Sequence, residues 1–253
     1  MTEAEATQYA ARYSDWPGVV QFLLTVFVIA IFVVTFVVQA FQIPSESMEN
    51  TLLIGDYLLV DKVRFGGDSF WRHIMPYQQV RRGDIIVFHY PVHPGEHFVK
   101  RVVGVPGDRL RLMNRELYVN GIAQREPYAR YTATIHDTFR DDFPRLNVVV
   151  PGLEGMWWEE MKKLVEDGQL IVPEGEYFVL GDNRDESLDS RYWGFVPREN
   201  IVGRPLMIYW SVRNAGADIR GESTSGEKIF HFIYALTHLF QLTRWDRTFR
   251  IVH

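Results

Sequence analysis

The feature that most constrains this 253-residue chain is an uncharged apolar run from Val19 to Phe41. A helix over these residues would be about 34 Å long, against a hydrocarbon core of about 30 Å. The run is rich in Val, Ile and Phe, which in water would favour a strand, but in lipid only a helix satisfies the backbone. We therefore expect one transmembrane helix over residues 18–41, preceded by a tail of residues 1–17.

The main alternative is a signal peptide that is removed, because Val38-Gln39-Ala40 resembles a small-residue cleavage site. The run is too long for the apolar part of a signal peptide, so a retained anchor is favoured. Arg12 is the only basic residue near its first flank, and Lys62 is the first beyond it. The positive-inside rule then predicts a cytoplasmic N-terminus, with the rest of the chain on the other side of the membrane.

Short apolar segments separated by Gly and Pro turns follow from Asp56 onward, a pattern typical of an antiparallel β domain. We assign this catalytic β core to residues 42–121 and 173–212. Residues 122–172 break the rhythm and are interpreted as an inserted cap region. The cap contains one predicted helix, whose apolar face comprises Trp157, Met161, Leu164 and Val165.

Residues 213–253 form a Gly/Ser-rich linker followed by an amphipathic helix. The apolar part of that helix, Ile229–Leu242, is short for a membrane span, so we expect it to lie at an interface. A second span is the alternative.

Composition excludes several classes of protein. The formal net charge of -5 argues against a nucleic-acid binder, and the absence of cysteine excludes disulfides, a Cys-based zinc site and a Cys nucleophile.

Three short motif matches do not indicate function. The zinc pattern H-x-x-E-H at His93–His97 needs a helix that Pro94-Gly95 forbids. The S-x-x-K match at Ser225 lies in the linker, and the alternation of Asp185, Ser187 and Asp189 lacks the glycine and terminal glutamate of a calcium loop. No metal or other cofactor is expected.

Two residues are candidates for nucleophilic catalysis. Ser47 follows the apolar run by six residues, and Lys100 lies in a segment, Phe98–Val103, that is apolar on both faces. Strand alternation places Lys100 with Phe98 and Val102 and sends Arg101 to the other face. Burial would favour the neutral amine, which could take a proton from a serine hydroxyl. A lysine whose stem packs while its ammonium reaches water is equally compatible with the spacing.

Four segments, in this order, resemble the conserved boxes of bacterial type I signal peptidases (leader peptidases), which are Ser-Lys dyad serine proteases. They are Pro44-Ser45-Glu46-Ser47-Met48, Arg82–Phe88, Lys100–Asp108 and Gly181–Gly194. The resemblance implies an antiparallel β catalytic core of that type. Three positions depart from the pattern: the family usually has Gly at Glu46, Pro at Asn50 and Asn at Glu186.

The resemblance also implies roles for individual residues. Ser47 would be the nucleophile and Lys100 the general base. Ser45 would contribute its hydroxyl to the oxyanion hole, beside the Ser47 backbone N–H. Ser187 would orient the Lys100 amine, and Asp189 and Arg191 would pair to hold the last loop.

The function implied is removal of N-terminal signal peptides from exported preproteins, by a single-pass enzyme of the bacterial cytoplasmic membrane. Its partners would be the signal peptides and the lipid bilayer, and a monomer is expected. We expect the substrate to bind in an extended form, in a pocket of Ile43, Met48, Phe98 and Val99. The rival hypotheses are a self-cleaving repressor, disfavoured because no helix-turn-helix is apparent, and a catalytically weak membrane-anchored binding or scaffold protein.

Overall fold

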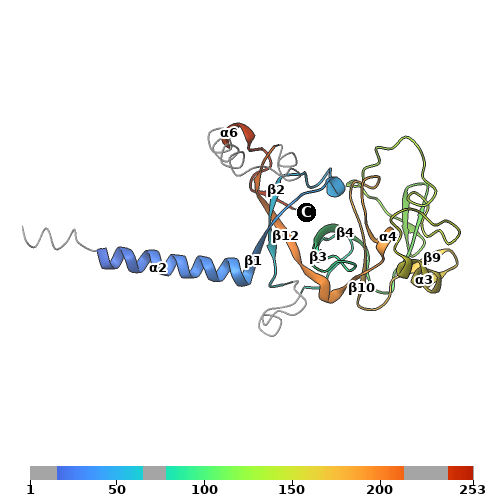
Figure 1. The fold of residues 1–253 in the computed structure, drawn as a ribbon, viewed down its shortest axis with the longest axis horizontal. Coiled ribbons are helices and arrows are strands. Elements are labelled where there is room, and N and C mark those ends of the chain that lie inside the picture. Colours follow the sequence, from blue (N-terminus) through green and yellow to red (C-terminus); the bar gives the residue numbers. More distant parts are fainter. Residues whose placement is uncertain (1–15, 65–77, 214–238, 253) are drawn as a thin grey trace, which may run out of the picture. The chain divides into compact units, whose positions relative to one another are not determined.

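The computed structural model describes residues 16–64, 78–213 and 239–252. The chain divides into two compact units, Met1–Gln39 and Ala40–His253 (Figure 1). Of the predicted C-terminal segment, residues 214–238 lie outside the described part, and with them the Ser225 motif and most of the predicted helix 229–242. The described end of that helix is α6 (Leu239–Leu242).

The apolar run does not form one helix to residue 41. The α-helix α2 (Trp16–Phe32) is followed by a π-helical turn, η1 (Val33–Val37), and then by strand β1 (Val38–Gln42). The predicted helix was therefore too long at its C-terminal end. The reason is the run of β-branched residues, which favour extended backbone; Val38 has φ −130° and ψ 153°. Within the described ranges, no helix combines the length and the apolar character that crossing a membrane requires.

The strands of the second unit form two antiparallel sheets, which confirms the predicted antiparallel β core, while the predicted transmembrane helix is not confirmed. The larger sheet has the order β1-β2-β12-β3-β4-β10-β11, and β13 pairs with β12 (Figure 1). The bounds of its further strands are Asp56–Asp61 (β2), Ile85–His89 (β3), His97–Gly104 (β4), Glu176–Leu180 (β10), Val196–Pro197 (β11), Ile201–Ser211 (β12) and Arg250–Ile251 (β13).

A smaller sheet has the order β7-β6-β5-β9-β8. It joins strands from both sides of the predicted boundary at residue 121, so the cap region continues a sheet that the β core begins. Its strands are Arg109–Met113 (β5), Glu116–Val119 (β6), Ile122–Ala123 (β7), Val165–Glu166 (β8) and Gln169–Ile171 (β9).

The predicted cap helix is present as α3 (Gly155–Leu164). Trp157 and Met161 are buried against the smaller sheet, and Leu164 and Val165 pack against the same cluster. Val165, which was predicted on the face of this helix, instead begins β8, and the β8–β9 turn comprises Asp167 and Gly168. Both residues have positive φ, as a two-residue hairpin turn requires.

Candidate active site

Ser47 lies in a short turn held between buried apolar anchors. Ile43, Met48 and Leu52 are at most 3% exposed and belong to one hydrophobic cluster. Between them the backbone forms the 3₁₀ turn η2 (Glu46–Met48), after Ser45 in an extended conformation. The turn is closed by hydrogen bonds from Glu49 N to the Glu46 carbonyl and from Leu52 N to the Met48 carbonyl. The anchors therefore fix the position of the Ser47 side chain, which is buried.

Lys100 reaches this turn from the middle of the larger sheet. Its strand β4 lies between β3 and β10, with Lys100 opposite Ile86. The side chain is buried, and its Nζ donates to Ser47 Oγ over 2.5 Å. Nζ also lies 5.6 Å from the centre of the Phe98 ring. The alternative of a lysine whose amine reaches water does not hold in this structure.

The surroundings of Lys100 favour the neutral amine. The pKa of Lys100 is lowered from 10.5 to about 8, mainly by burial; the charge of Asp189 raises it, that of Arg191 lowers it, and that of Asp182 raises it. Burial is the largest of these effects because each carboxylate is already paired with an arginine. An amine with this pKa can accept a proton close to neutral pH.

Arg101, the next residue in β4, points to the other face of the sheet and pairs with a buried carboxylate. Its Nε and Nη2 donate to the two carboxylate oxygens of Asp182 at 2.8 and 2.7 Å, and its Nη1 donates to the Gly83 carbonyl at 2.8 Å. Thr51 Oγ1 donates to Asp182 at 2.5 Å. Sequence reasoning missed this pair, although strand alternation already implied a buried arginine that needs a carboxylate.

Asp189 and Arg191 form a second buried pair in the loop after β10. Arg191 Nε and Nη2 donate to the two Asp189 oxygens, each at 2.8 Å, and neither side chain is exposed. Burial alone would raise the pKa of Asp189, but the Arg191 charge and hydrogen bonds lower it overall. Asp189 also accepts from Gly181 N at 3.1 Å. The pair thus ties both ends of the loop together.

The same loop meets the Ser47 turn directly. Asn183 N donates to the Ser47 carbonyl at 3.1 Å, and Asn183 Nδ2 donates to the Glu46 carbonyl at 3.3 Å. At Gly181 a Cβ atom would lie 2.5 Å from the Ser47 carbonyl oxygen and 2.3 Å from Ser187 Oγ. A residue without a side chain is therefore required at this approach.

Two further residues with predicted roles, Ser45 and Ser187, lie near Ser47 and Lys100. Ser45 Oγ is 3.4 Å from Ser47 Oγ, as a second hydroxyl beside the nucleophile. Ser187 is buried, but its hydroxyl makes no hydrogen bond to the Lys100 amine and instead helps to lower the pKa of Asp189. Its orienting role stays a prediction.

A cleft of about 270 Å³ opens beside Ser47 and Lys100. All four residues predicted for the substrate pocket line it, together with residues that sequence reasoning did not select. The predicted ones are Ile43, Met48, Phe98 and Val99; the additional ones include Phe41, His97, Glu186 and Leu188. Burial and the neighbouring His89 lower the pKa of His97.

Comparison with known proteins identifies the family of this chain. The family described as "Signal peptidase, peptidase S26" matches residues 16–210. The chain belongs to this family. The signal peptidase I of Pseudomonas fluorescens is 36% identical over 207 residues, covering 74% of this chain and 69% of that protein. The signal peptidase I of Aquifex aeolicus is 35% identical over 220 residues, covering 75% of this chain and 82% of that protein. The resemblance seen in the sequence is thus confirmed.

The structure shows the conformation or exposure of the three residues that depart from the usual signal peptidase pattern. Asn50 has φ 105°, which proline cannot adopt, and its amide donates to the Tyr128 carbonyl at 3.0 Å. Glu186 is exposed at the cleft, and Glu46 is exposed directly before the nucleophile. The turn after Ser47 is therefore held in this chain by a side-chain hydrogen bond.

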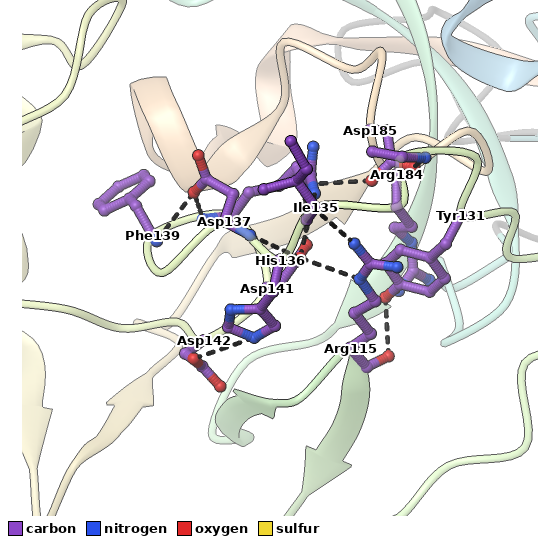
Figure 2. Close-up of polar contacts among 12 residues, drawn as sticks. Arg115, Tyr131, Ile135, His136, Asp137, Phe139, Asp141, Asp142, Arg184 and Asp185 are labelled. Atoms are coloured by element: carbon purple, nitrogen blue, oxygen red, sulfur yellow. Dashed lines mark hydrogen bonds and ion pairs between the residues drawn. The ribbon is translucent and has the colours of Figure 1, made fainter.

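A second polar region, here called the loop cluster, lies where the loop 181–191 meets the cap region (Figure 2). Asp185, which the sequence had suggested as part of a calcium-like pattern, accepts from the backbone N–H groups of Thr132 and Ala133 and lies 3.1 Å from Arg140 Nε. The described part of the chain contains no group of three or more side chains arranged to hold a metal ion. The remaining members of the cluster are Arg115, Glu126, Tyr131, Asp141 and Arg184.

Proposed function

We propose that this chain is a serine endopeptidase that removes signal peptides from exported preproteins, with Ser47 as nucleophile and Lys100 as general base. The observation that carries the proposal is the 2.5 Å contact between a buried lysine amine and a buried serine hydroxyl, in a signal peptidase family member. The apolar cleft beside the two groups provides a place for the substrate.

In the proposed reaction the neutral Lys100 amine accepts the Ser47 hydroxyl proton while Oγ attacks the carbonyl carbon of the scissile peptide bond. The resulting oxyanion would be stabilised by the Ser45 hydroxyl and the Ser47 backbone N–H. Lys100 then gives its proton to the leaving amine as the C–N bond breaks, which leaves an acyl-enzyme on Ser47. A water molecule, deprotonated by the same amine, hydrolyses the ester and restores the hydroxyl.

The geometry of the cleft supports binding of an extended peptide. Phe41 and Gln42 of β1 and His97, Phe98 and Val99 of β4 form two of its walls. β1 stands at one end of the strand order, so its outer edge is unpaired among the described strands. A substrate strand added along β1 would bring its side chains over the apolar wall and its backbone toward Ser47.

The location of the enzyme is part of the proposal. We place it in the bacterial cytoplasmic membrane as a single-pass monomer, with its N-terminus in the cytoplasm and the catalytic unit outside. The support is the uncharged run Val19–Phe41, which ends six residues before Ser47. A nucleophile so close to the run would meet peptide bonds that emerge from the same bilayer.

The test is cleavage of a preprotein by the full chain in detergent or in vesicles. We expect Ser47→Ala and Lys100→Ala each to lower kcat/KM by about 10⁴-fold or more, because neither group has a substitute. The logarithm of kcat/KM of the unmodified chain should rise with pH through about 8, the pKa of Lys100, and then level off. Turnover by either variant at the unmodified rate, or a rise in activity only near pH 10, would contradict the dyad.

A further inference from the structure

The β3–β4 hairpin brings two histidines together at the cleft. His89 is the last residue of β3 and His97 the first of β4, and the two are directly opposite in the antiparallel register. Their ring centres are 4.4 Å apart, with 46° between the ring planes. The rejected zinc pattern paired His97 with His93, which lies in the connecting loop; the strands pair it with His89 instead.

Hydrogen bonding fixes which nitrogen of His89 is available to a ligand. His89 Nδ1 lies 3.0 Å from the Pro94 carbonyl oxygen. A carbonyl only accepts, so Nδ1 carries the proton and Nε2 of the neutral ring has a free lone pair. A backbone carbonyl on the second ring nitrogen is also the usual way in which proteins orient a metal-binding histidine.

The position of His97 is restricted from the other side. Its ring centre lies 5.2 Å from that of Phe41 and 4.4 Å from that of His89, so the ring packs against both. His97 and Phe41 both line the cleft that contains Ser47 and Lys100, whereas His89 does not. A ligand shared by the two histidines would therefore sit at the wall of the cleft.

We propose that His89 and His97 form a two-histidine site for a divalent transition metal, Zn²⁺, Ni²⁺ or Cu²⁺, and that its occupation inhibits the enzyme. Imidazole nitrogens bind these ions at about 2.0–2.1 Å, so the two donors must come within about 3–4 Å of each other. Rings 4.4 Å apart meet this requirement with small side-chain rotations. Water completes the coordination, so binding is reversible. The bound metal narrows the cleft in which the substrate would lie, because His97 forms part of the cleft wall. The inhibition, but not the binding, depends on the proposed function.

Binding is tested with the metal alone, by calorimetric titration of Zn²⁺ into the full chain in detergent, with Mg²⁺ as a hard-cation control. We expect one zinc site in the micromolar range and no binding of Mg²⁺ to it. His89→Gln and His97→Gln should each weaken zinc binding by about tenfold or more, because one imidazole cannot chelate. His93→Gln is the matched control and should bind as the unmodified chain does. Equal affinity in all four proteins, or no zinc binding by the unmodified chain, overturns the site.

Inhibition is tested separately in the preprotein assay. Zn²⁺ should slow cleavage, EDTA should restore it, and His89→Gln should retain the metal-free rate but lose the sensitivity to zinc. Equal inhibition of the unmodified chain and His89→Gln would overturn the inhibitory role. If no preprotein were cleaved without metal, the proposed function would fail, while calorimetry would still decide on the metal site. His97 is exposed, so His97→Gln keeps the binding test valid should His89→Gln fail to fold.

Discussion

The cleft and the loop cluster both bury a basic side chain, but the pKa of that side chain is lowered in the cleft and raised in the loop cluster. In the loop cluster Arg184 is fully buried and donates to both oxygens of Glu126, at 2.9 and 2.7 Å. Burial alone would lower the pKa of Arg184, but the Glu126 charge raises it overall. In the cleft the nearest polar partner of Lys100 is the neutral hydroxyl of Ser47, and the pKa of the lysine falls.

Asp141 illustrates the loop-cluster side of the comparison (Figure 2). It is fully buried and accepts from Arg140 at 2.8 and 3.0 Å and from Arg115 at 2.9 Å. Burial would raise its pKa, but these hydrogen bonds and the backbone N–H of Asp137 lower it overall. A buried group with a partner of opposite charge thus has a pKa that favours its charged form, whereas the buried Lys100 amine has a pKa that favours its neutral form.

The largest stability change is expected in the loop cluster, on removal of the partner of Arg184. Glu126→Ala should lower the free energy of unfolding by about 3–5 kcal/mol, because it leaves a buried guanidinium uncompensated. The measurement is denaturant unfolding at pH 7. Glu126→Gln, which keeps the shape and one acceptor, should lose less. A loss below about 1 kcal/mol in the alanine variant would mean that the pair does not hold the loop.

In the cleft, removal of the charged side chain is expected to raise the free energy of unfolding rather than lower it. The folded pKa of Lys100 is about 8 against 10.5 for the free side chain, a difference that corresponds to about 3 kcal/mol. Below pH 8 the lysine is protonated in both states, and the folded state is destabilised by the full cost of a buried ammonium. Between pH 8 and 10.5 the lysine is protonated only in the unfolded state, so the free energy of unfolding rises with pH.

Lys100→Met should therefore abolish cleavage and raise the free energy of unfolding by about 3 kcal/mol at pH 7. The gain should shrink toward pH 10.5. Unfolding curves of the two proteins at pH 7 and pH 10 measure it. A variant that is less stable than the unmodified chain at pH 7 would contradict the claim that burial destabilises the protonated form of Lys100.

A smaller effect is expected at Glu176, a half-buried carboxylate. Burial, and then the charges of Glu160 and Glu199, raise its pKa from 4.5 to about 7. The folded state therefore loses stability as pH rises from 4.5 to 7, and the penalty persists above that range. After allowance for solvent screening, Glu176→Gln should gain roughly 1 kcal/mol at pH 8. No gain is expected at pH 4, so a gain that is equal at both pH values would exclude titration of Glu176 as its cause.

The smallest effect is expected for an exposed pair. Arg109 and Glu166 are 2.9 Å apart, with side chains 42% and 60% exposed. Arg109→Ala should change the free energy of unfolding by less than about 1 kcal/mol, and added salt should reduce the difference further. A loss as large as that of Glu126→Ala would show that burial is not what separates the two kinds of pair.

Local patterns predicted much of the fold and part of the site. Strand alternation correctly put Lys100 with Phe98 and Arg101 on the other face, and helical spacing correctly put Trp157 and Met161 on the buried face of α3. The same reasoning failed at residues 33–41, because an apolar β-branched run satisfies both the rule for a lipid helix and the rule for a strand.

Partners that are distant in the sequence could not be predicted, since no local pattern encodes them. Glu126 and Arg184 are 58 positions apart, and Arg101 and Asp182 are 81 apart. The partner of His97 is another example, because the sequence excluded a helical zinc motif at His93–His97 but did not predict that His89 would lie opposite His97. A buried arginine predicts a carboxylate partner, but only the folded structure shows which carboxylate it is.

The contacts of Asn183 have a consequence for when activity appears during folding. Ser47 contacts Lys100 across 53 positions, and the carbonyl of the preceding Glu46 contacts Asn183 across 137. Contacts of such wide sequence separation close late, because each must overcome a large loop-closure entropy. A chain still being synthesised has the nucleophile but not the loop that holds it. Under the proposed mechanism, activity should therefore appear only after the loop 181–191 has docked on the Ser47 turn.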